Sequence, residues 1–232
     1  MSKLVSTDIA DGIATIRMDD GKANVLSFDM LEALNAAFDV AEDAGAVIIF
    51  TGRKGGIFSG GYDLNIMMSG PENAIKLTCE GSRFALRICR HPYPVIIANT
   101  GHAIAMGAFL HLAADFRIGA DAGTKTGLNE TQIGMTMHHF GIELAREFIP
   151  KNWLGRSMIN GEIFGPEDAR SAGYYDILAP KDAVMEKARA VAAQMKLLNM
   201  RAFKGTKCKS RKAFLERLEW AIDVDSKMSV LE

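Results

Sequence analysis

Short apolar segments of strand length alternate with helix-length segments over the first half of the chain, and this alternation constrains the fold more than any other feature. The strand candidates are residues 4–10, 13–18, 47–51, 95–99 and 116–119. Ser27 is placed to cap a helix that Gly45 ends, and a second helix is expected over residues 72–88, after the break at Gly70-Pro71. Strands joined by helical crossovers predict an α/β core.

The chain opens with the pattern of a β-hairpin. The first two strand candidates flank Asp11-Gly12. This dipeptide readily adopts the positive φ angles that a two-residue hairpin turn requires. We therefore expect an antiparallel pair at the start of the sheet.

Beyond residue 134 the pattern becomes mainly helical. Helices are expected over residues 139–148, 153–160 and 166–172, with a short strand near 176–178. Apolar residues then recur at helical spacing over 184–198 and again over 214–222. We expect residues 1–180 to form the catalytic core, and residues 181–232 to form a helical region that closes the site or contacts a neighbouring subunit.

The global composition favours a small-molecule ligand. The formal net charge is -1, which gives no reason to expect nucleic acid or a membrane as a partner. The 3 cysteines are odd in number and far apart, unlike a disulfide framework or a zinc site, and fit a reducing compartment. The first residues lack an apolar leader core, so we expect a soluble, cytoplasmic protein.

Three segments combine small residues with residues that can carry chemistry: 58–64, 101–108 and 127–134. In the first two, glycine and alanine allow the backbone to approach a ligand closely, and a helix start then directs free N–H groups outward. Such N–H groups suit an anion that develops during a reaction. Glycine-rich turns before helices also occur as simple connections, so only the joint occurrence of the three segments indicates a site.

In this order, the three segments resemble the signature loops of the crotonase family, the enoyl-CoA hydratases and isomerases. The likeness extends to residues 22–26, 47–51 and 166–173, and so covers most of the chain. Residues 127–134 are most similar to the segment that carries the catalytic glutamate in isomerases that move a double bond from position 3 to position 2. The resemblance implies a crotonase-type α/β fold, a superhelix of ββα turns with a helical C-terminal region, assembled as a homotrimer or homohexamer.

By that resemblance, the backbone N–H groups of Tyr62 and Met106 form an oxyanion hole for the thioester carbonyl of an acyl-CoA substrate, and Glu130 transfers the proton. Each preorganised donor is typically worth on the order of a hundredfold in rate. A carboxylate in an apolar acyl pocket has its pKa raised by desolvation and becomes a competent base. Met106 replaces the glycine that is usual at this position, and its side chain is large enough to narrow the pocket.

The resemblance also assigns contacts with coenzyme A to groups in and near the first two segments. The expected residues are Ala23, Val25, Ser59, Gly60, Gly61, Tyr62, Asp63, Leu64, Met106 and Gly107. It implies no metal and no cofactor beyond the coenzyme A moiety of the substrate. A basic cluster at 204–212 precedes the last expected helix, where it lies either near the coenzyme A phosphate or on a solvated helix face.

Phe109 stands where the hydratases of this family carry a second catalytic glutamate. Hydration needs two groups to hold and deprotonate a water, whereas isomerisation needs one base that removes a proton from C2 and returns it at C4. We therefore favour an enoyl-CoA isomerase, with hydration of a 2-enoyl-CoA as the alternative. His138 and His139 depart from the family pattern and are candidates for a further proton relay, although such pairs are more often structural.

Other classes of function are weaker. A noncatalytic acyl-CoA-binding protein of the same fold stays open, because a fold and a ligand pocket do not guarantee turnover. A nucleotide-binding module is disfavoured, because the chain has neither a phosphate-loop motif nor a Gly-x-Gly run. Metal-dependent hydrolysis is disfavoured, because the histidines at 91, 102, 111, 138 and 139 lack ligand spacing.

Overall fold

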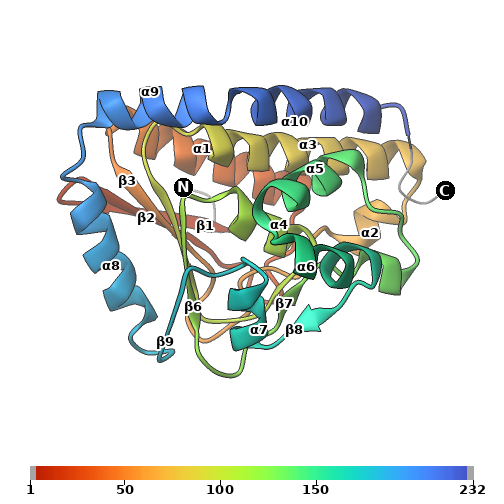
Figure 1. Ribbon diagram of the computed structural model, residues 1–232, viewed down its shortest axis with the longest axis horizontal. Coiled ribbons are helices and arrows are strands. Elements are labelled where there is room, and N and C mark those ends of the chain that lie inside the picture. Colours follow the sequence, from red (N-terminus) through yellow and green to blue (C-terminus); the bar gives the residue numbers. More distant parts are fainter. Residues whose placement is uncertain (1–3, 229–232) are drawn as a thin grey trace.

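The computed structural model describes residues 4–228, which form two β-sheets surrounded by helices (Figure 1). The larger sheet has the strand order β1-β2-β3-β4-β6-β9. Its strands are β1 (Val5–Ala10), β2 (Ile13–Met18), β3 (Val47–Thr51), β4 (Val95–Asn99), β6 (Phe116–Ala120) and β9 (Ile177–Ala179). The first pair is antiparallel and each following pair is parallel, so the predicted α/β core is confirmed.

Local sequence signals account for the hairpin and the first helix. Asp11 and Gly12 have φ angles of 52° and 71°, as a two-residue hairpin turn requires. The Ser27 Oγ accepts a hydrogen bond from the Met30 N–H at 3.2 Å and so caps α1 (Phe28–Asp43). Gly45, with φ 64°, follows the end of this helix. The hairpin, the cap and the stop are confirmed.

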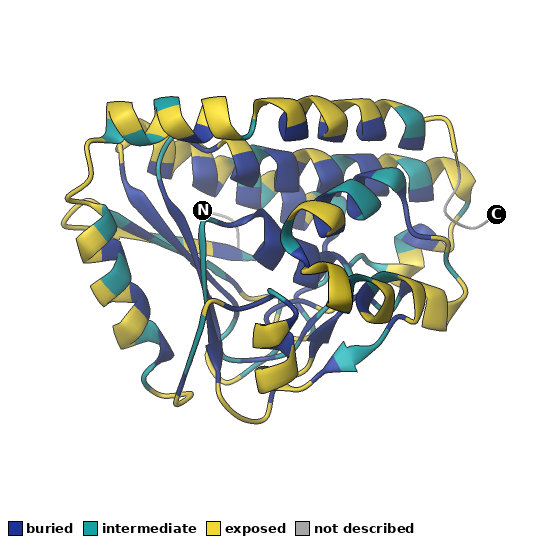
Figure 2. Ribbon diagram, viewed as in Figure 1, coloured by how far each residue is buried: buried dark blue, intermediate teal, exposed yellow. Residues whose placement is uncertain are grey.

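Helices cover both faces of the larger sheet and create two separate cores. On one face α1, α3 (Pro71–Arg90) and α4 (Met106–Ala113) contribute to the larger core. On the other face α8 (Val184–Met195) packs on β3, β4 and β6. Every residue of β3 and β4 is buried, as expected for parallel strands that are covered on both sides (Figure 2).

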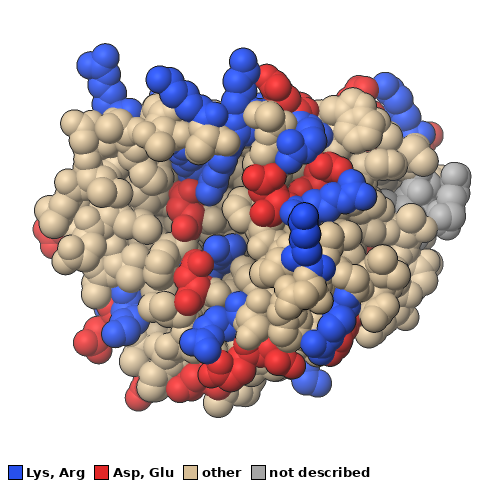
Figure 3. All heavy atoms as spheres, in the orientation of Figure 1, with Lys and Arg blue, Asp and Glu red and all other residues tan. Residues whose placement is uncertain are grey.

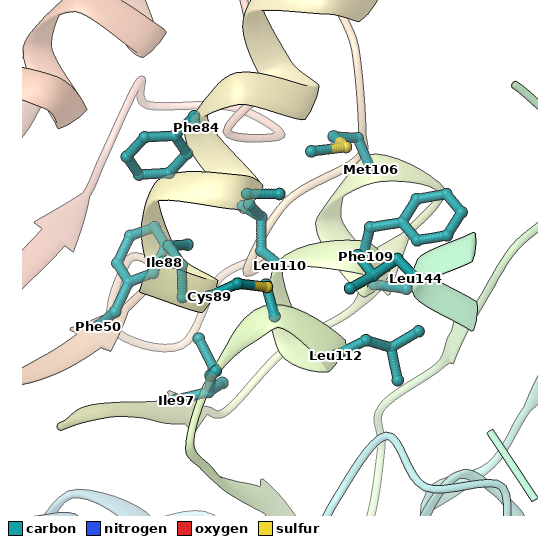
Figure 4. Close-up of a cluster of buried hydrophobic side chains, with 14 of the residues drawn as sticks. Phe50, Phe84, Ile88, Cys89, Ile97, Met106, Phe109, Leu110, Leu112 and Leu144 are labelled. Carbon is teal, nitrogen blue, oxygen red and sulfur yellow. The ribbon is translucent and has the colours of Figure 1, made fainter. Parts of the chain in front are cut away.

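Helix α4 lies inside the larger core. All of its residues are buried, which is the pattern of a helix surrounded by protein. Figure 4 shows its Met106, Phe109 and Leu110 among buried side chains from α3 and the sheet. Because this helix is enclosed on all sides, its N-terminus, where the second glycine-containing segment ends, has a fixed position.

The strands of the smaller sheet were not among the strand candidates of the sequence. This sheet has the order β5-β7-β8, with β5 (Ala103–Ile104), β7 (Thr126–Gly127) and β8 (Ile163–Phe164). Strands this short show no periodicity in the sequence. The remaining short elements are α2 (Leu64–Met67), the 3-10 turn η1 (Glu130–Ile133), α6 (Lys151–Leu154), the π-helical turn η2 (Gly155–Ile159) and α7 (Pro166–Ser171).

Three further helices complete the described chain: α5 (His139–Phe148), α9 (Met200–Ser210) and α10 (Lys212–Asp225). In Figure 1, α9 and α10 follow one another along the top of the molecule, and α10 packs on α3 and α5. Helix α9 was not predicted, and most of the basic cluster lies on this helix, directly before α10. The division at residue 180 falls between β9 and α8, and the assignment of the two parts stays a prediction.

The surface carries mixed charge. On the face shown in Figure 3, Lys and Arg side chains are interspersed with Asp and Glu. Within residues 4–228, no helix combines the length and the apolar character that a membrane span requires. The mixed charge on the face shown in Figure 3 gives no indication of a polyanionic partner.

One buried carboxylate ties the C-terminal helices to the sheet. Asp115, between α4 and β6, pairs with the Lys207 Nζ at 2.6 Å and the Arg211 Nη2 at 3.2 Å. It also accepts the N–H of Val95, the first residue of β4, at 3.0 Å. The side chains of Asp115 and Lys207 are 8% and 5% exposed, and burial lowers the pKa of Lys207. Lys207 and Arg211, both members of the basic cluster, therefore hold α9 and α10 on the core.

Replacement of Asp115 by Asn is expected to destabilise the protein more than replacement of Lys207 by Met. D115N leaves the buried Lys207 and the partly exposed Arg211 without their counter-ion, and breaking a buried ion pair in this way typically costs about 3–5 kcal/mol. K207M removes one cation and leaves the carboxylate with its other partners. Chemical denaturation of each variant measures the free energy of unfolding.

Glu216→Gln is the matched control, because its partner Lys212 lies 4.0 Å away in an exposed pair. The control is expected to change the free energy of unfolding by less than about 0.5 kcal/mol. A loss for D115N no greater than that of the control would contradict the anchoring role of Asp115.

Candidate active site

The three glycine-containing segments of the sequence meet at one place. Ile104 donates its N–H to the carbonyl of Ser59 at 3.0 Å, which joins the second segment to the first. The Ala105 N–H donates to the carbonyl of Gly127 at 2.9 Å, which joins the third segment to the second. The Leu26 N–H donates to the first segment at the Gly61 carbonyl, at 2.8 Å. Backbone hydrogen bonds therefore set the relative positions of all the segments.

Two glycines make this close approach possible. Gly61 has φ 92°, and a Cβ placed on it would lie 3.0 Å from the Ala105 Cβ and 3.1 Å from the Ile104 carbonyl oxygen. A Cβ on Gly107 would lie 2.6 Å from the Ser59 carbonyl oxygen. Any larger residue would separate the segments, so both positions require glycine.

The backbone N–H groups of Tyr62 and Met106 are available to a ligand at this junction. In the part of the chain that the structure describes, neither N–H donates to a protein acceptor. Met106 is the first residue of α4, where helix N–H groups lack intrahelical partners and carry partial positive charge. The preceding Ala105 has φ 51° and ψ -123°, a combination that residues other than glycine rarely adopt. A strained turn therefore presents the second amide.

The side chain of Met106 points into the core. It is fully buried, and Figure 4 shows it among apolar side chains of α3 and α4. A pocket, described below, adjoins this junction, and Ala105 forms part of its wall next to Met106. The expectation that the Met106 side chain narrows the pocket is therefore corrected: only the backbone of this residue lies at the site.

A pocket of about 130 Å³ adjoins the two segments. Its apolar wall consists of Leu64, Met67, Ile104, Ala105, Ile133 and Met135. Its polar lining consists of Tyr62, Thr78, Asn129, Glu130 and His138, together with Gly60. A mainly apolar wall with a few convergent polar groups is typical of a small-molecule site.

Glu130 begins η1 and carries the only carboxylate in the lining of this pocket as far as the structure describes the chain. The residue is 9% exposed, and its Oε2 has no hydrogen-bond partner among the described residues. Burial raises its pKa from the ordinary 4.5 to about 7. Such a carboxyl group exchanges protons readily near neutral pH, which is the property of a general base.

The residues expected to contact coenzyme A divide into two sets. Gly60, Tyr62 and Leu64 line the pocket. The others support the loops: the Ala23 carbonyl accepts the Gly60 N–H at 2.8 Å, and the Asp63 carboxylate caps α2. Val25 is partly exposed beside this junction, whereas Ser59, Gly61, Met106 and Gly107 are buried. The ligand contacts of all these residues stay predictions.

The side chain of Tyr62 closes one side of the pocket. Its hydroxyl donates to the carbonyl of Thr78 on α3 at 3.0 Å. A Cβ on Gly81 of the same helix would lie 2.4 Å from the ring, so this glycine makes room for the tyrosine. Tyr62 therefore contributes a backbone donor and a fixed aromatic wall from one residue.

The two adjacent histidines have different environments. His139 pairs with Asp225 through its Nδ1 at 3.0 Å, and Asp225 also accepts the N–H groups of His139 and Phe140 at the start of α5. This is a structural cap. His138 lines the pocket, is 6% exposed, and has an Nε2 without a hydrogen-bond partner among the described residues. Burial lowers the pKa of His138 to about 4.

Phe109 lies behind the pocket wall. It is fully buried, and its ring contacts the ring of His138 edge to face, with 5.5 Å between centroids. A Cβ on Gly141 would lie 2.7 Å from the Phe109 ring, so α5 packs directly on it. The position that the resemblance assigns to a second carboxylate is therefore filled by an apolar core residue.

Thr78 and Asn129 were not identified as site residues from the sequence. Thr78 lies on α3 in the same buried stripe as Ala74, Leu77 and Ala85. A polar residue within an apolar stripe was the available signal, but in isolation it does not show that the stripe lines a pocket. Asn129 directly precedes Glu130, and only the fold shows that both line the same wall.

The raised pKa of Glu130 predicts a pH-dependent gain in stability for Glu130→Gln. Because the pKa is about 7 in the folded protein and 4.5 ordinarily, the folded state binds the proton more tightly, and this group destabilises the fold as pH rises between these values. From pH 5 to pH 8 the stability of E130Q relative to the wild type is expected to rise by on the order of 2–3 kcal/mol.

Denaturant titrations of both proteins at the two pH values measure this gain. Glu186→Gln, at an exposed position on α8, removes one negative charge without changing the pocket and serves as the control. An equal pH effect in both variants would contradict the assignment to Glu130.

Comparison with known proteins gives the context of this geometry. A model of the enoyl-CoA hydratase/isomerase family matches residues 8–230. The structure of an enoyl-CoA hydratase/isomerase family protein from Pseudomonas syringae is 50% identical, with a TM-score of 0.95, and the match covers 97% of this chain and 98% of that chain.

The relatives include proteins named as isomerases and proteins named as hydratases. Human mitochondrial enoyl-CoA delta isomerase 1 is 28% identical over 226 residues, which are 96% of this chain and 75% of that protein. A probable enoyl-CoA hydratase from Bacillus subtilis is 30% identical over 194 residues, which are 82% of this chain and 75% of that protein. The two names leave the reaction open, but the family match spans nearly the whole chain. The protein is an enzyme of the enoyl-CoA hydratase/isomerase family and has the crotonase fold.

Proposed function

We propose that the protein converts 3-enoyl-CoA thioesters to 2-enoyl-CoA thioesters. The observation that carries this proposal is that Glu130 is the one carboxylate in the described lining of a pocket that adjoins two unpaired backbone donors. One base and one oxyanion hole are sufficient for an isomerisation in which a proton leaves one carbon and enters another.

The proposed reaction begins with the thioester oxygen bound by the N–H groups of Tyr62 and Met106. The Glu130 carboxylate removes a proton from C2, and the electrons of that C–H bond move toward the thioester carbonyl, whose oxygen becomes negative. The resulting dienolate is conjugated with the original C3=C4 bond. The protonated Glu130 then returns the proton to C4, the electrons form the C2=C3 bond, and the carboxylate is regenerated.

The geometry supports the electrostatic part of this scheme. Both donors are backbone groups held by other hydrogen bonds, so they need no reorganisation when charge develops on the oxygen. With a pKa of about 7, the Glu130 carboxylate is a stronger base than an ordinary carboxylate. Its protonated form is still acidic enough to return the proton to C4.

Hydration of 2-enoyl-CoA is the second candidate, and His138 is the observation that favours it. This side chain lines the same pocket and lies against Phe109, which stands where the hydratases carry their second glutamate. However, a histidine with a pKa near 4 is neutral at pH 7 and is a weak base, so it is a poor replacement for a carboxylate. We therefore rank isomerisation above hydration.

The other parts of the assignment are also proposals. Coenzyme A is expected to lie along residues 22–26 and 59–64, with no cofactor beyond this moiety of the substrate. A homotrimer or homohexamer is expected by resemblance to the family, and a cytoplasmic location is expected from the cysteine pattern and the first residues of the sequence. Analytical ultracentrifugation of the purified protein measures the assembly.

Replacement of Glu130 by Gln is expected to remove double-bond migration. Loss of a general base typically costs about 10²–10⁴-fold in rate. Purified wild type and E130Q are incubated with 3-enoyl-CoA and 2-enoyl-CoA thioesters of several lengths, and migration and hydration are followed separately. Glu72→Gln, at an exposed position in the first turn of α3, is the control for loss of a carboxylate elsewhere.

Migration that persists in E130Q would exclude the proposed base. Hydration as the main activity of the wild type would favour the second candidate. Tight coenzyme A binding without turnover of any thioester would favour a noncatalytic binding protein.

The pH dependence of kcat/KM is expected to follow the ionisation of Glu130. Because the carboxylate is the active form and the pKa is about 7, the rate of migration should rise with pH, with a midpoint near 7, and level off above it. Initial rates between pH 5 and pH 9 measure this profile. A rate that falls as pH rises through 7 would mean that a protonated group is the essential one.

A further inference from the structure

Three polar side chains other than Glu130 bring unpaired atoms to the pocket region. The Thr78 Oγ1, Asn129 Oδ1 and His138 Nε2 are buried, and none has a hydrogen-bond partner within the described chain. Thr78 and His138 are 2% and 6% exposed. The three residues come from α3, from the residue before η1 and from the residue before α5. Separate elements therefore bring these groups to one wall.

Unpaired buried polar groups are uncommon in folded proteins, because each has lost its hydrogen bonds with water without a replacement. A plain hydrocarbon acyl chain would leave all three unpaired. An acyl chain that carries oxygen would supply the missing partner, since a hydroxyl side chain, an amide oxygen and an imidazole together offer donors and acceptors.

The charges around the pocket favour an uncharged oxygen. No Lys or Arg is part of its wall in the described residues, and the Glu130 carboxylate would repel a second carboxylate. The charged and titratable neighbours of His138 are Asp225, which raises its pKa, and His139, which lowers it, but burial dominates and keeps the imidazole neutral at pH 7. A neutral imidazole offers one N–H donor and one acceptor nitrogen, which suit a hydroxyl or a carbonyl.

We infer that Thr78, Asn129 and His138 form a polar subsite that binds a hydroxyl or carbonyl oxygen on the acyl chain of the substrate. The inference deepens the proposed function by naming the substrate class, oxygenated acyl-CoA thioesters, and rests on it only in that the ligand is an acyl-CoA. His138 acts in this subsite through hydrogen bonding, while Glu130 alone transfers the proton.

Calorimetric titration with saturated thioesters tests the subsite without turnover. Hexanoyl-CoA is compared with 5-oxohexanoyl-CoA and 6-hydroxyhexanoyl-CoA, none of which has a double bond to move. The wild type is expected to bind at least one oxygenated thioester roughly tenfold more tightly than hexanoyl-CoA, as one well-formed hydrogen bond provides.

His138→Phe keeps an aromatic ring beside Phe109 but removes both ring nitrogens, and is expected to abolish the preference. Thr78→Val is close in shape, lacks the hydroxyl, and is expected to reduce the preference. Met67→Leu changes an apolar part of the same wall and is expected to retain it. Circular dichroism shows whether each variant is folded. If His138→Phe does not fold, Thr78→Val still tests whether the polar side chains cause the preference.

Equal affinities for the three thioesters in the wild type, or a preference that persists in both polar variants, would overturn the subsite. Dehydration of 3-hydroxyhexanoyl-CoA by the wild type that is lost in His138→Phe would also overturn it, because the polar atoms would then hold the reacting water. Absence of migration activity together with an intact preference would reject the proposed isomerase while the subsite stands.

Discussion

The site depends on the close approach of two backbone segments at Gly61 and Ala105. A Cβ on Gly61 would lie 3.0 Å from the Ala105 Cβ, which is tighter than most real contacts, and the φ of 92° at Gly61 disfavours any side chain. The amides that follow these residues are the proposed oxyanion donors, so this approach sets their separation. Helix α4 is buried at every position and cannot shift to accommodate a wider gap. The core therefore holds the geometry of the site, although none of its side chains takes part in the chemistry.

Several features that cost folding free energy lie around this junction. Ala105 has a positive φ, Glu130 is a buried carboxyl group without a partner for one oxygen, and the Nε2 of His138 is unpaired within the described chain. Outside the pocket, some buried polar groups are paired, as Asp115 is with Lys207, whereas others, such as the two ring nitrogens of His111, have no hydrogen-bond partner among the described residues. What distinguishes the pocket is that a positive φ at a residue other than glycine and a buried carboxyl group with a raised pKa occur together there, a combination typical of a binding or catalytic site.

Sequence reasoning succeeded where short-range chemistry determines structure. Ser27 caps its helix, and Asp11-Gly12 turns the hairpin, because each effect involves residues a few positions apart. It failed where a partner is distant in sequence. Helix α9 was missed because Lys207, which pairs with Asp115 across 92 positions, reads as a solvated residue when its partner is unknown. Likewise, adjacent His138 and His139 cannot be distinguished until the fold shows that the Asp225 carboxylate pairs with the His139 ring and that His138 lines the pocket.

The features that define the family and the features that select its reaction lie in different parts of this site. The backbone donors and their glycine supports depend on main-chain geometry, and so they suit any reaction through a stabilised enolate. In the proposed function, selection falls to the pocket wall and to Phe109 behind it, which occupies the position that the resemblance assigns to a second carboxylate, while Thr78 and His138 bring polar atoms to the wall. Because a single substitution in the wall alters the available proton donors without moving the oxyanion hole, overall similarity to isomerases and hydratases does not determine which reaction occurs. The identity of a few wall residues does.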